Sequence, residues 1–180
     1  MNEEIQVNEL FSVFGQPMPM HQIISGDVVP EPYHSLLVHP NHMTLAVEGY
    51  YQGPVKVRVL DRHDDGERYA RLILLERASD GLVVQFGIMR INLSDCPEAV
   101  RHAILAEDTP LGRILIEHDV MRRIEPTAFM RVEVQPPLAT WLAQTGTTYG
   151  RLGFIHVNDK PAVELIEILA PIPPQPEGGR

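Results

Sequence analysis

A chain of 180 residues, 44% hydrophobic and 22% charged, can form one compact domain with a buried core, which excludes a disordered protein. The net charge of −9 disfavours nucleic acids and anionic membrane surfaces as partners, and no apolar run reaches the roughly 18 residues of a transmembrane helix. The single cysteine, Cys96, excludes an intrachain disulfide and, with an acidic start that lacks the features of a signal peptide, predicts a cytoplasmic protein.

The first third of the chain shows little regular patterning. Residues 8–14 could form a short amphipathic helix, and the Pro- and His-containing stretch to about residue 42 is predicted as loop. We expect residues 1–34 to be an irregular segment that could act as a lid and residues 35–170 to be the domain proper. Residues 171–180, with four prolines and two glycines, are predicted to be a disordered tail.

The middle and the end of the chain are rich in strands. Apolar alternation between Gly- and Asp-containing turns predicts strands over residues 55–60, 69–75, 82–91, 129–134, 147–157 and 162–169. Helices are expected over residues 42–51, 95–105, 109–118 and 137–143. Strands grouped in this way, without alternation of strand and helix, predict an α+β fold with a mainly antiparallel sheet.

The segment Thr109-Pro110-Leu111-Gly112-Arg113 predicts an anion site at a helix start. Thr109 is a good helix N-cap and Pro110 a good first helical residue. The backbone N–H groups of Leu111 and Gly112 would then be unpaired, so a carboxylate or phosphate could bind there.

Charged residues in two apolar strands could complete such a site. Alternation places Arg71 on one face with Tyr69 and Ile73, where a guanidinium needs an anionic partner. Glu164 and Glu167 are three residues apart, so only one of them can face a shared pocket, and the pattern does not choose between them.

The histidines and the cysteine suggest other chemistry only weakly. His34, His39 and His42 lie close together in the sequence, but their spacing matches no compact ligand pattern, so we predict no metal site. Cys96 lies beside a predicted helix start without an accompanying histidine motif, and we interpret it as a spare thiol.

Taken together in order, several segments resemble the chorismate pyruvate-lyase family, most closely its cyanobacterial and mycobacterial branch, which makes 4-hydroxybenzoate. The matching segments are Tyr69-Ala70-Arg71-Leu72-Ile73-Leu74-Leu75, Gly87, Thr109-Pro110-Leu111-Gly112-Arg113, Gly150-Arg151 and Glu167-Ile168-Leu169-Ala170-Pro171. The resemblance covers roughly residues 35 to 172. It implies a curled antiparallel sheet with helices packed on one side, enclosing an aromatic-acid site.

The resemblance also implies a role for each matching residue. Arg71 would bind the carboxylate of the aromatic product, assisted by the backbone amide of Leu111. Glu167, chosen in this way over Glu164, would contact the ring hydroxyl, and Met43 would supply a backbone contact from the lid region. Arg71 and Glu167 would be the catalytic residues.

The implied reaction eliminates the enolpyruvyl group of chorismate as pyruvate and leaves 4-hydroxybenzoate for quinone or phenolic biosynthesis, without metal or organic cofactor. Because chorismate carries two carboxylates, we expect Arg151 or Arg90 to bind the second one. The partners expected are thus chorismate and 4-hydroxybenzoate, with no nucleic acid and no membrane insertion, and the sequence does not indicate the oligomeric state.

Two alternatives stay open. One is a non-catalytic, effector-sensing domain of the same fold that binds a small aromatic acid. Regulators with such domains carry a basic helix-turn-helix segment, and the sequence before residue 43 does not resemble one. The other alternative is a related lyase that makes another hydroxybenzoate.

Overall fold

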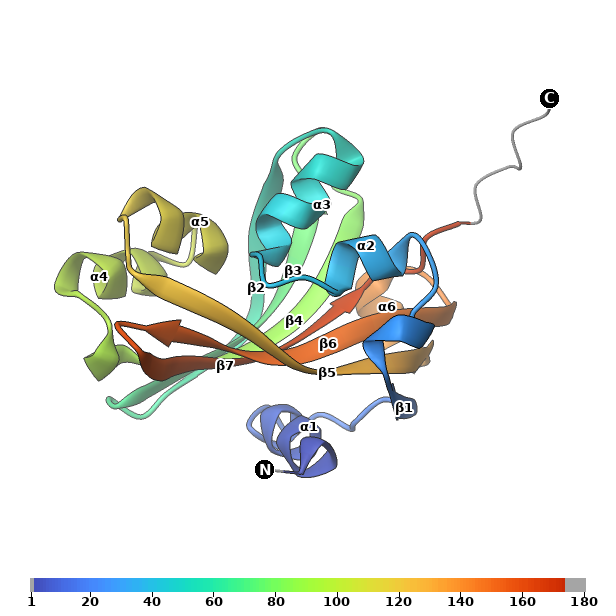
Figure 1. The fold of residues 1–180 in the computed structure, drawn as a ribbon, viewed down its shortest axis with the longest axis horizontal. Helices are drawn as coiled ribbons and strands as arrows, with labels where there is room; N and C mark the ends of the chain where they lie inside the picture. Colours follow the sequence, from blue (N-terminus) through green and yellow to red (C-terminus); the bar gives the residue numbers. More distant parts are fainter. Residues whose placement is uncertain (1, 174–180) are drawn as a thin grey trace.

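Seven antiparallel strands form one curled sheet in a computed structural model that describes residues 2–173 (Figure 1). Their order across the sheet is β1-β5-β6-β7-β4-β3-β2. The strands are β1 (His21–Ile24), β2 (Val55–Asp64), β3 (Arg68–Arg77), β4 (Val83–Asn92), β5 (Arg122–Val134), β6 (Gly146–Val157) and β7 (Lys160–Leu169). The expected α+β class with a mainly antiparallel sheet is therefore confirmed.

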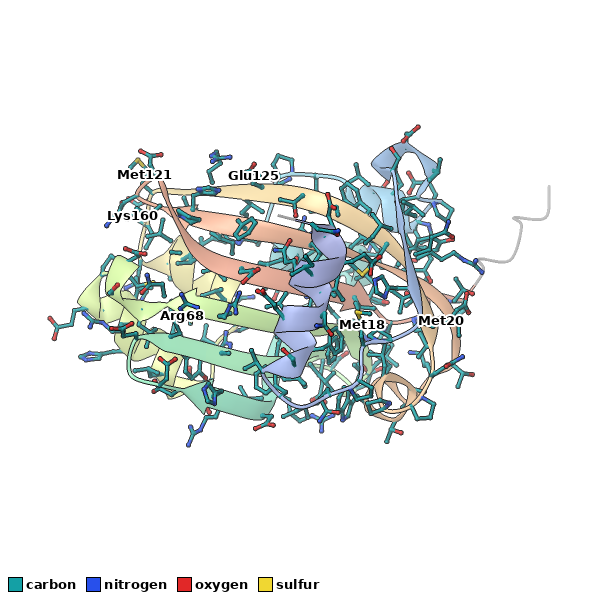
Figure 2. All side chains as sticks on the ribbon, turned by 90° about the horizontal axis from the view of Figure 1, so that it is seen from below. Met18, Met20, Arg68, Met121, Glu125 and Lys160 are labelled. Carbon is teal, nitrogen blue, oxygen red and sulfur yellow. The ribbon has the colours of Figure 1, made fainter. Side chains whose placement is uncertain are left out.

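Most of the helices pack on one face of this sheet, as the resemblance implied, and two pack on the other face. The helices α2 (Tyr33–Leu37), α3 (Met43–Tyr51), α4 (Glu98–Ala106) and α5 (Leu111–Glu117) lie on one face, above the sheet in Figure 1. The helices α1 (Glu3–Ser12) and α6 (Leu138–Leu142) pack on the other face, and Figure 2 shows α1 crossing the strands there. Short 3₁₀ turns are η1 (Gly26–Val28) and η2 (Leu93–Asp95).

Two apolar clusters, one on each face, explain the composition of the central strands. Alternation along β3 sends Tyr69 and Ile73 to the cluster beneath α3 and α5, and sends Leu72 and Leu74 to the cluster beneath α1. A strand covered on both faces needs apolar residues at nearly every position, as β3, β4 and β7 have. Arg71 interrupts that pattern on the α3 and α5 face.

Residues 3–24, expected to be irregular, contribute α1 and β1. The helix begins at Glu3 rather than near residue 8, with the Asn2 side chain accepting a hydrogen bond from the Glu4 backbone N–H. The strand β1 is held by pairing with β5, a partner more than 100 residues later in the chain that no local pattern indicates. The helix α1 packs beneath the sheet through Leu10 and Phe11, so it is part of the domain. It does not cover the face on which α3 and α5 lie.

The start of β5 and the end of the chain also differ from expectation. The strand β5 begins at Arg122 instead of residue 129, because a bulge between Pro126 and Ala128 breaks its alternation while pairing with β6 continues. Ile172 donates its backbone N–H to the Tyr33 hydroxyl at 2.7 Å, so the first part of the expected tail is attached to α2. The rest of that tail, 174–180, lies outside the described residues. Within residues 2–173, no helix is long and apolar enough to cross a membrane.

Candidate functional site

A small cavity lies between the α3 and α5 face of the sheet and the start of these two helices. The sheet supplies Arg71, Gln85, Met89 and Glu167 to its wall, together with aliphatic side chains such as Ile73 and Leu165. The cover is formed by residues 42–44 and 110–112. The volume of the cavity is about 30 Å³, which is room for a water molecule.

Arg71 places an unpaired positive charge in this wall. Its side chain is fully buried at 0% exposure, and neither Nη atom has a hydrogen-bond partner among the described residues. Its Nε lies 3.3 Å from the sulfur of Met89, which is a weak acceptor. Burial lowers the pKa of the guanidinium, and the nearby Tyr69 and Glu107 oppose that shift. A buried guanidinium with unused N–H groups has the chemistry to bind an anion such as a carboxylate.

Gln85 is a second polar group of the wall, and the sequence analysis did not identify it. It is 2% exposed, and its Oε1 has no hydrogen-bond partner among residues 2–173. The signal was present in the sequence, because alternation in β4 places Gln85 on the same face as Met89. An amide carbonyl in this position can accept a hydrogen bond from a ligand hydroxyl.

Glu167 also lines the cavity, and its carboxylate is held from behind by Arg151. The Nε of Arg151 donates to Oε2 of Glu167 at 2.8 Å, and both residues are buried. Glu164 belongs to the opposite face, where it forms an ion pair with Arg90. The structure therefore places Glu167, and not Glu164, at the cavity. This agrees with the alternation argument that only one of the two can face a shared pocket.

The arginines expected to bind a second carboxylate are engaged elsewhere. Arg151 donates from Nη1 to the carbonyls of Leu37 (3.3 Å) and His39 (3.0 Å), and from Nη2 to that of Asn41 (3.0 Å). With Nε bound to Glu167, at most one of its five N–H groups is left, and Arg151 lies behind the wall rather than in it.

Arg90 is on the other side of the sheet, where its Nε donates to Glu164 at 2.9 Å and its Nη2 lies 3.3 Å from Glu9. Neither arginine is thus positioned as the sequence analysis expected.

The cover of the cavity joins α5 to the start of α3. Leu111, Gly112 and Met43 all line the cavity, as the sequence analysis expected of Leu111 and Met43. The N-cap of α5 is Pro110, however, and not Thr109, whose hydroxyl donates to the neighbouring Asp108 at 2.8 Å. Close packing favours Gly112, since a Cβ there would lie 3.0 Å from the Cβ of His42.

His42 forms part of this cover in its neutral state. Its Nε2 accepts a hydrogen bond from Nε of Arg122 at 2.8 Å, which leaves the proton on Nδ1. Burial and the positive charges of Arg122 and Arg151 lower the pKa of His42 to about 4.

The three clustered histidines have separate surroundings: His34 lies beside Glu31, and His39 accepts from the Asn41 backbone N–H. In the part of the chain that the structure describes, no three His, Cys, Asp or Glu side chains come together as a metal site.

Comparisons with known proteins show the fold. No family model and no curated protein matches the sequence. PhnF from Mycobacterium smegmatis is similar in structure with a TM-score of 0.55 at 10% identity, and the match covers 74% of this chain and 65% of PhnF. The chain thus spans just under two thirds of the length of that protein.

Two regulators give weaker matches. The ligand-binding domain of a Bordetella bronchiseptica protein assigned to the GntR family of transcriptional regulators has a TM-score of 0.49 at 13% identity, covering 64% of this chain and 85% of that domain. A GntR-family regulator from Bacillus cereus has a TM-score of 0.45 at 10% identity, covering 70% of this chain and 98% of the other. At these identities the likeness concerns the fold alone, and it is the chorismate lyase-like fold, with a curled antiparallel sheet and helices packed against it.

Proposed function

We propose that this chain binds a small aromatic carboxylic acid in the cavity, with the carboxylate on Arg71. The observation that carries the proposal is the guanidinium of Arg71, fully buried and without partners on both Nη atoms. Burying an unpaired charge is costly, and a carboxylate fits the two Nη atoms as a bidentate partner. The apolar side chains of Ile73, Leu75 and Leu165 line the cavity, and such a lining suits an aromatic ring.

The polar groups of the far wall favour a ring that carries a hydroxyl group. Gln85 offers an unused acceptor oxygen, and Glu167 offers a carboxylate whose orientation is fixed by Arg151. A phenolic hydroxyl can donate to either of them. We therefore infer that 4-hydroxybenzoate, with one carboxylate and one hydroxyl, is a ligand of this cavity.

The finer function that we propose is chorismate pyruvate-lyase, because the residues in the wall are those of the family that the sequence resembles. The reaction breaks the bond between the ring carbon and the ether oxygen, so that enolpyruvate leaves, and removes one proton from the ring, which becomes aromatic. The enolpyruvate takes up one proton at its CH2 carbon and becomes pyruvate. The products are 4-hydroxybenzoate and pyruvate. Arg71 would hold the ring carboxylate and Glu167 the ring hydroxyl, so that positioning and electrostatics accelerate the elimination.

One observation favours a second candidate, a domain that binds an aromatic acid without converting it. Among residues 2–173, Arg71 is the arginine in the cavity wall, and its single charge matches a single carboxylate. Chorismate carries two, and the side chain of Arg151 is already occupied. The fold itself is compatible with either function, since folds host sites of many kinds.

One experiment separates these functions. The purified protein is incubated with chorismate, pyruvate and 4-hydroxybenzoate are followed together by chromatography, and binding of 4-hydroxybenzoate is measured by calorimetry. We expect equimolar products, with loss of turnover in Arg71→Met and Glu167→Gln and little change in Glu164→Gln, whose side chain lies on the opposite face.

Binding of 4-hydroxybenzoate without turnover would favour the second candidate, and pyruvate with another aromatic acid would indicate a related lyase. If neither compound binds, or if Arg71→Met binds 4-hydroxybenzoate as the unchanged protein does, the proposed site is wrong.

A further inference from the structure

One buried guanidinium, that of Arg151, connects the wall of the cavity to its cover. Arg151 lies in β6 and is 1% exposed. Its Nε donates to Glu167 at 2.8 Å, while its Nη atoms donate to the backbone carbonyls of three residues, the last residue of α2 and two in the segment that links α2 to α3. These are Leu37 at 3.3 Å, His39 at 3.0 Å and Asn41 at 3.0 Å. Figure 1 shows this link passing over the sheet between the two helices.

The same segment continues directly into the cover. His42, Met43 and Thr44 follow Asn41 and line the cavity. The carbonyls that Arg151 holds are therefore one to seven residues away from the side chains that close the site. The hydrogen bond that Arg151 donates to the carbonyl of Asn41 therefore restrains the residue directly before residues 42–44.

The cover has to move if an aromatic ligand is to bind. The cavity measures about 30 Å³, whereas a cavity that binds benzene measures roughly 150 Å³. The strands beneath are fixed by hydrogen bonds on both sides, since β3, β4 and β7 are all interior strands of the sheet. The residues that can yield are those of the cover.

We propose that Arg151 is a positioning residue that fastens residues 37–44 over the cavity and orients Glu167 at the same time. The expected effects on ligand binding rest on the proposed function. The fastening of residues 37–44 does not, because it is a property of the protein without ligand. Because one planar group makes both sets of contacts, a ligand that hydrogen-bonds to Glu167 favours the closed cover, and an open cover releases the carboxylate of Glu167.

Arginine is suited to this role in a way that lysine is not. The guanidinium directs Nε toward Glu167 and both Nη atoms toward the backbone, in a rigid planar arrangement. A lysine ammonium in the same place keeps the charge and can satisfy Glu167 or the carbonyls, but its single nitrogen cannot reach both sets. The substitution Arg151→Lys therefore tests the connection without leaving Glu167 as an unpaired buried charge.

Two further contacts hold the cover and limit how far Arg151→Lys can increase its opening. Arg122 donates to His42, and Arg113 forms an ion pair with Glu48 in α3. Both persist in Arg151→Lys. The expected result is consequently a cover that opens more often, not one that is lost.

Hydrogen–deuterium exchange of the ligand-free protein measures this opening directly. In Arg151→Lys we expect the backbone amides of residues 37–44 to exchange about tenfold faster or more, while those of β3 and β4 exchange at the original rate. The matched control is Arg90→Lys, because Arg90, although less buried than Arg151, is also paired with a glutamate of β7, on the face away from the cover. It should leave exchange in residues 37–44 unchanged.

A second variant covers the case in which Arg151→Lys does not fold. Glu167→Gln keeps an oxygen acceptor for Arg151 but removes the charge that holds the guanidinium in place. We expect a smaller increase in exchange, about two- to fivefold, confined to the same residues. A purely structural role of Arg151 would speed up exchange throughout the sheet instead.

A measurement with ligand then tests whether binding at Glu167 and closure of the cover are coupled through Arg151. In the unchanged protein, 4-hydroxybenzoate should slow exchange in residues 37–44, and Arg151→Lys should bind it through Arg71 but dissociate about tenfold faster or more, with that protection lost. If no aromatic acid binds to the unchanged protein, the proposed function fails while the ligand-free exchange still tests the fastening. Unchanged exchange of residues 37–44 in a folded Arg151→Lys, or an equal effect of Arg90→Lys, would overturn the inference.

Discussion

The unpartnered charge of Arg71 can be tested by replacing the residue with methionine, which keeps much of the side-chain volume and removes the guanidinium. Arg71 is 0% exposed and has no carboxylate partner within the described residues, so the ligand-free protein bears the cost of its desolvation. Met89, which contacts Nε, is an apolar neighbour that can accommodate another thioether. We therefore expect Arg71→Met to be more stable than the original protein and unable to bind the ligand.

The two effects can be given magnitudes. Replacing buried charged groups by apolar residues of similar volume is often neutral or stabilising by about 1–4 kcal/mol. For a domain of this size, each kcal/mol changes Tm by about 2–4 °C, so Tm should rise by roughly 2–16 °C. Removing one partner of a buried charge pair costs about 2–5 kcal/mol of binding free energy. The Kd for 4-hydroxybenzoate should therefore increase by a factor of roughly 30 to several thousand.

Thermal denaturation and calorimetric titration with 4-hydroxybenzoate, both at pH 7, measure these changes. Arg90→Met is the matched control, because it breaks the ion pair with the buried Glu164 on the opposite face. It should lower the stability by about 1–3 kcal/mol, since the pair is partly exposed to water, and leave the Kd unchanged. An Arg71→Met protein that is less stable and still binds 4-hydroxybenzoate would refute the argument that Arg71 is retained for a ligand.

The cover and the pH dependence provide the remaining predictions. The pKa of His42 is lowered from 6.5 to about 4 by burial and by its arginine neighbours, so the unfolded chain takes up this proton first as the pH falls. The free energy of unfolding should therefore fall by about 3 kcal/mol between pH 7.5 and pH 4 in urea titrations, and His42→Gln should lose this part of the slope. Gly112→Ala should lower the stability by about 1–3 kcal/mol in thermal denaturation, because its Cβ would lie 3.0 Å from both His42 Cβ and Thr44 Oγ1. Gly49→Ala, in α3 with no atom within 4 Å of the new Cβ, should raise it by about 0.5–1 kcal/mol, and equal effects of the two alanines would contradict this packing argument.

The central strands could be predicted from sequence because their patterning is local. Alternation within β3 was enough to place Arg71 on an apolar face, and the spacing of Glu164 and Glu167 was enough to place them on opposite faces. Both results depend only on the period of a strand. Gln85 could have been found by the same reasoning, since it stands on the same face of β4 as Met89.

The remaining features depend on contacts between distant parts of the chain. The backbone carbonyls that bind Arg151 lie 110 or more positions earlier in the sequence, and backbone acceptors leave no pattern of side chains to read. The strand β1 exists because β5 offers it an edge, and the start of α5 is displaced from Thr109 because that hydroxyl binds Asp108 instead. The expectation that Arg151 binds the second carboxylate of chorismate rested only on its position in a strand, and its observed hydrogen bonds leave no room for that role.

The charges around the cavity lead to a difference between the two ligands of the proposed reaction. Glu167 and Arg151 neutralise each other, so Arg71 contributes one net positive charge to the wall. The carboxylate of 4-hydroxybenzoate balances that charge, whereas chorismate would leave one negative charge without a partner in a closed site, which is unfavourable. Two arginines beside the cover, Arg122 and Arg113, are bound to His42 and to Glu48 of α3. Chorismate should therefore bind with the cover partly open and at least about 100-fold more weakly than 4-hydroxybenzoate, a difference of about 2.7 kcal/mol.

Competition binding, at times short relative to any turnover, measures both affinities. An affinity for chorismate equal to that for 4-hydroxybenzoate at pH 7 would mean that Arg122 or Arg113 turns inward when the dianion binds. In that case Arg122→Lys and Arg113→Lys would identify it, because only the residue that moves would weaken chorismate binding and leave 4-hydroxybenzoate binding unchanged.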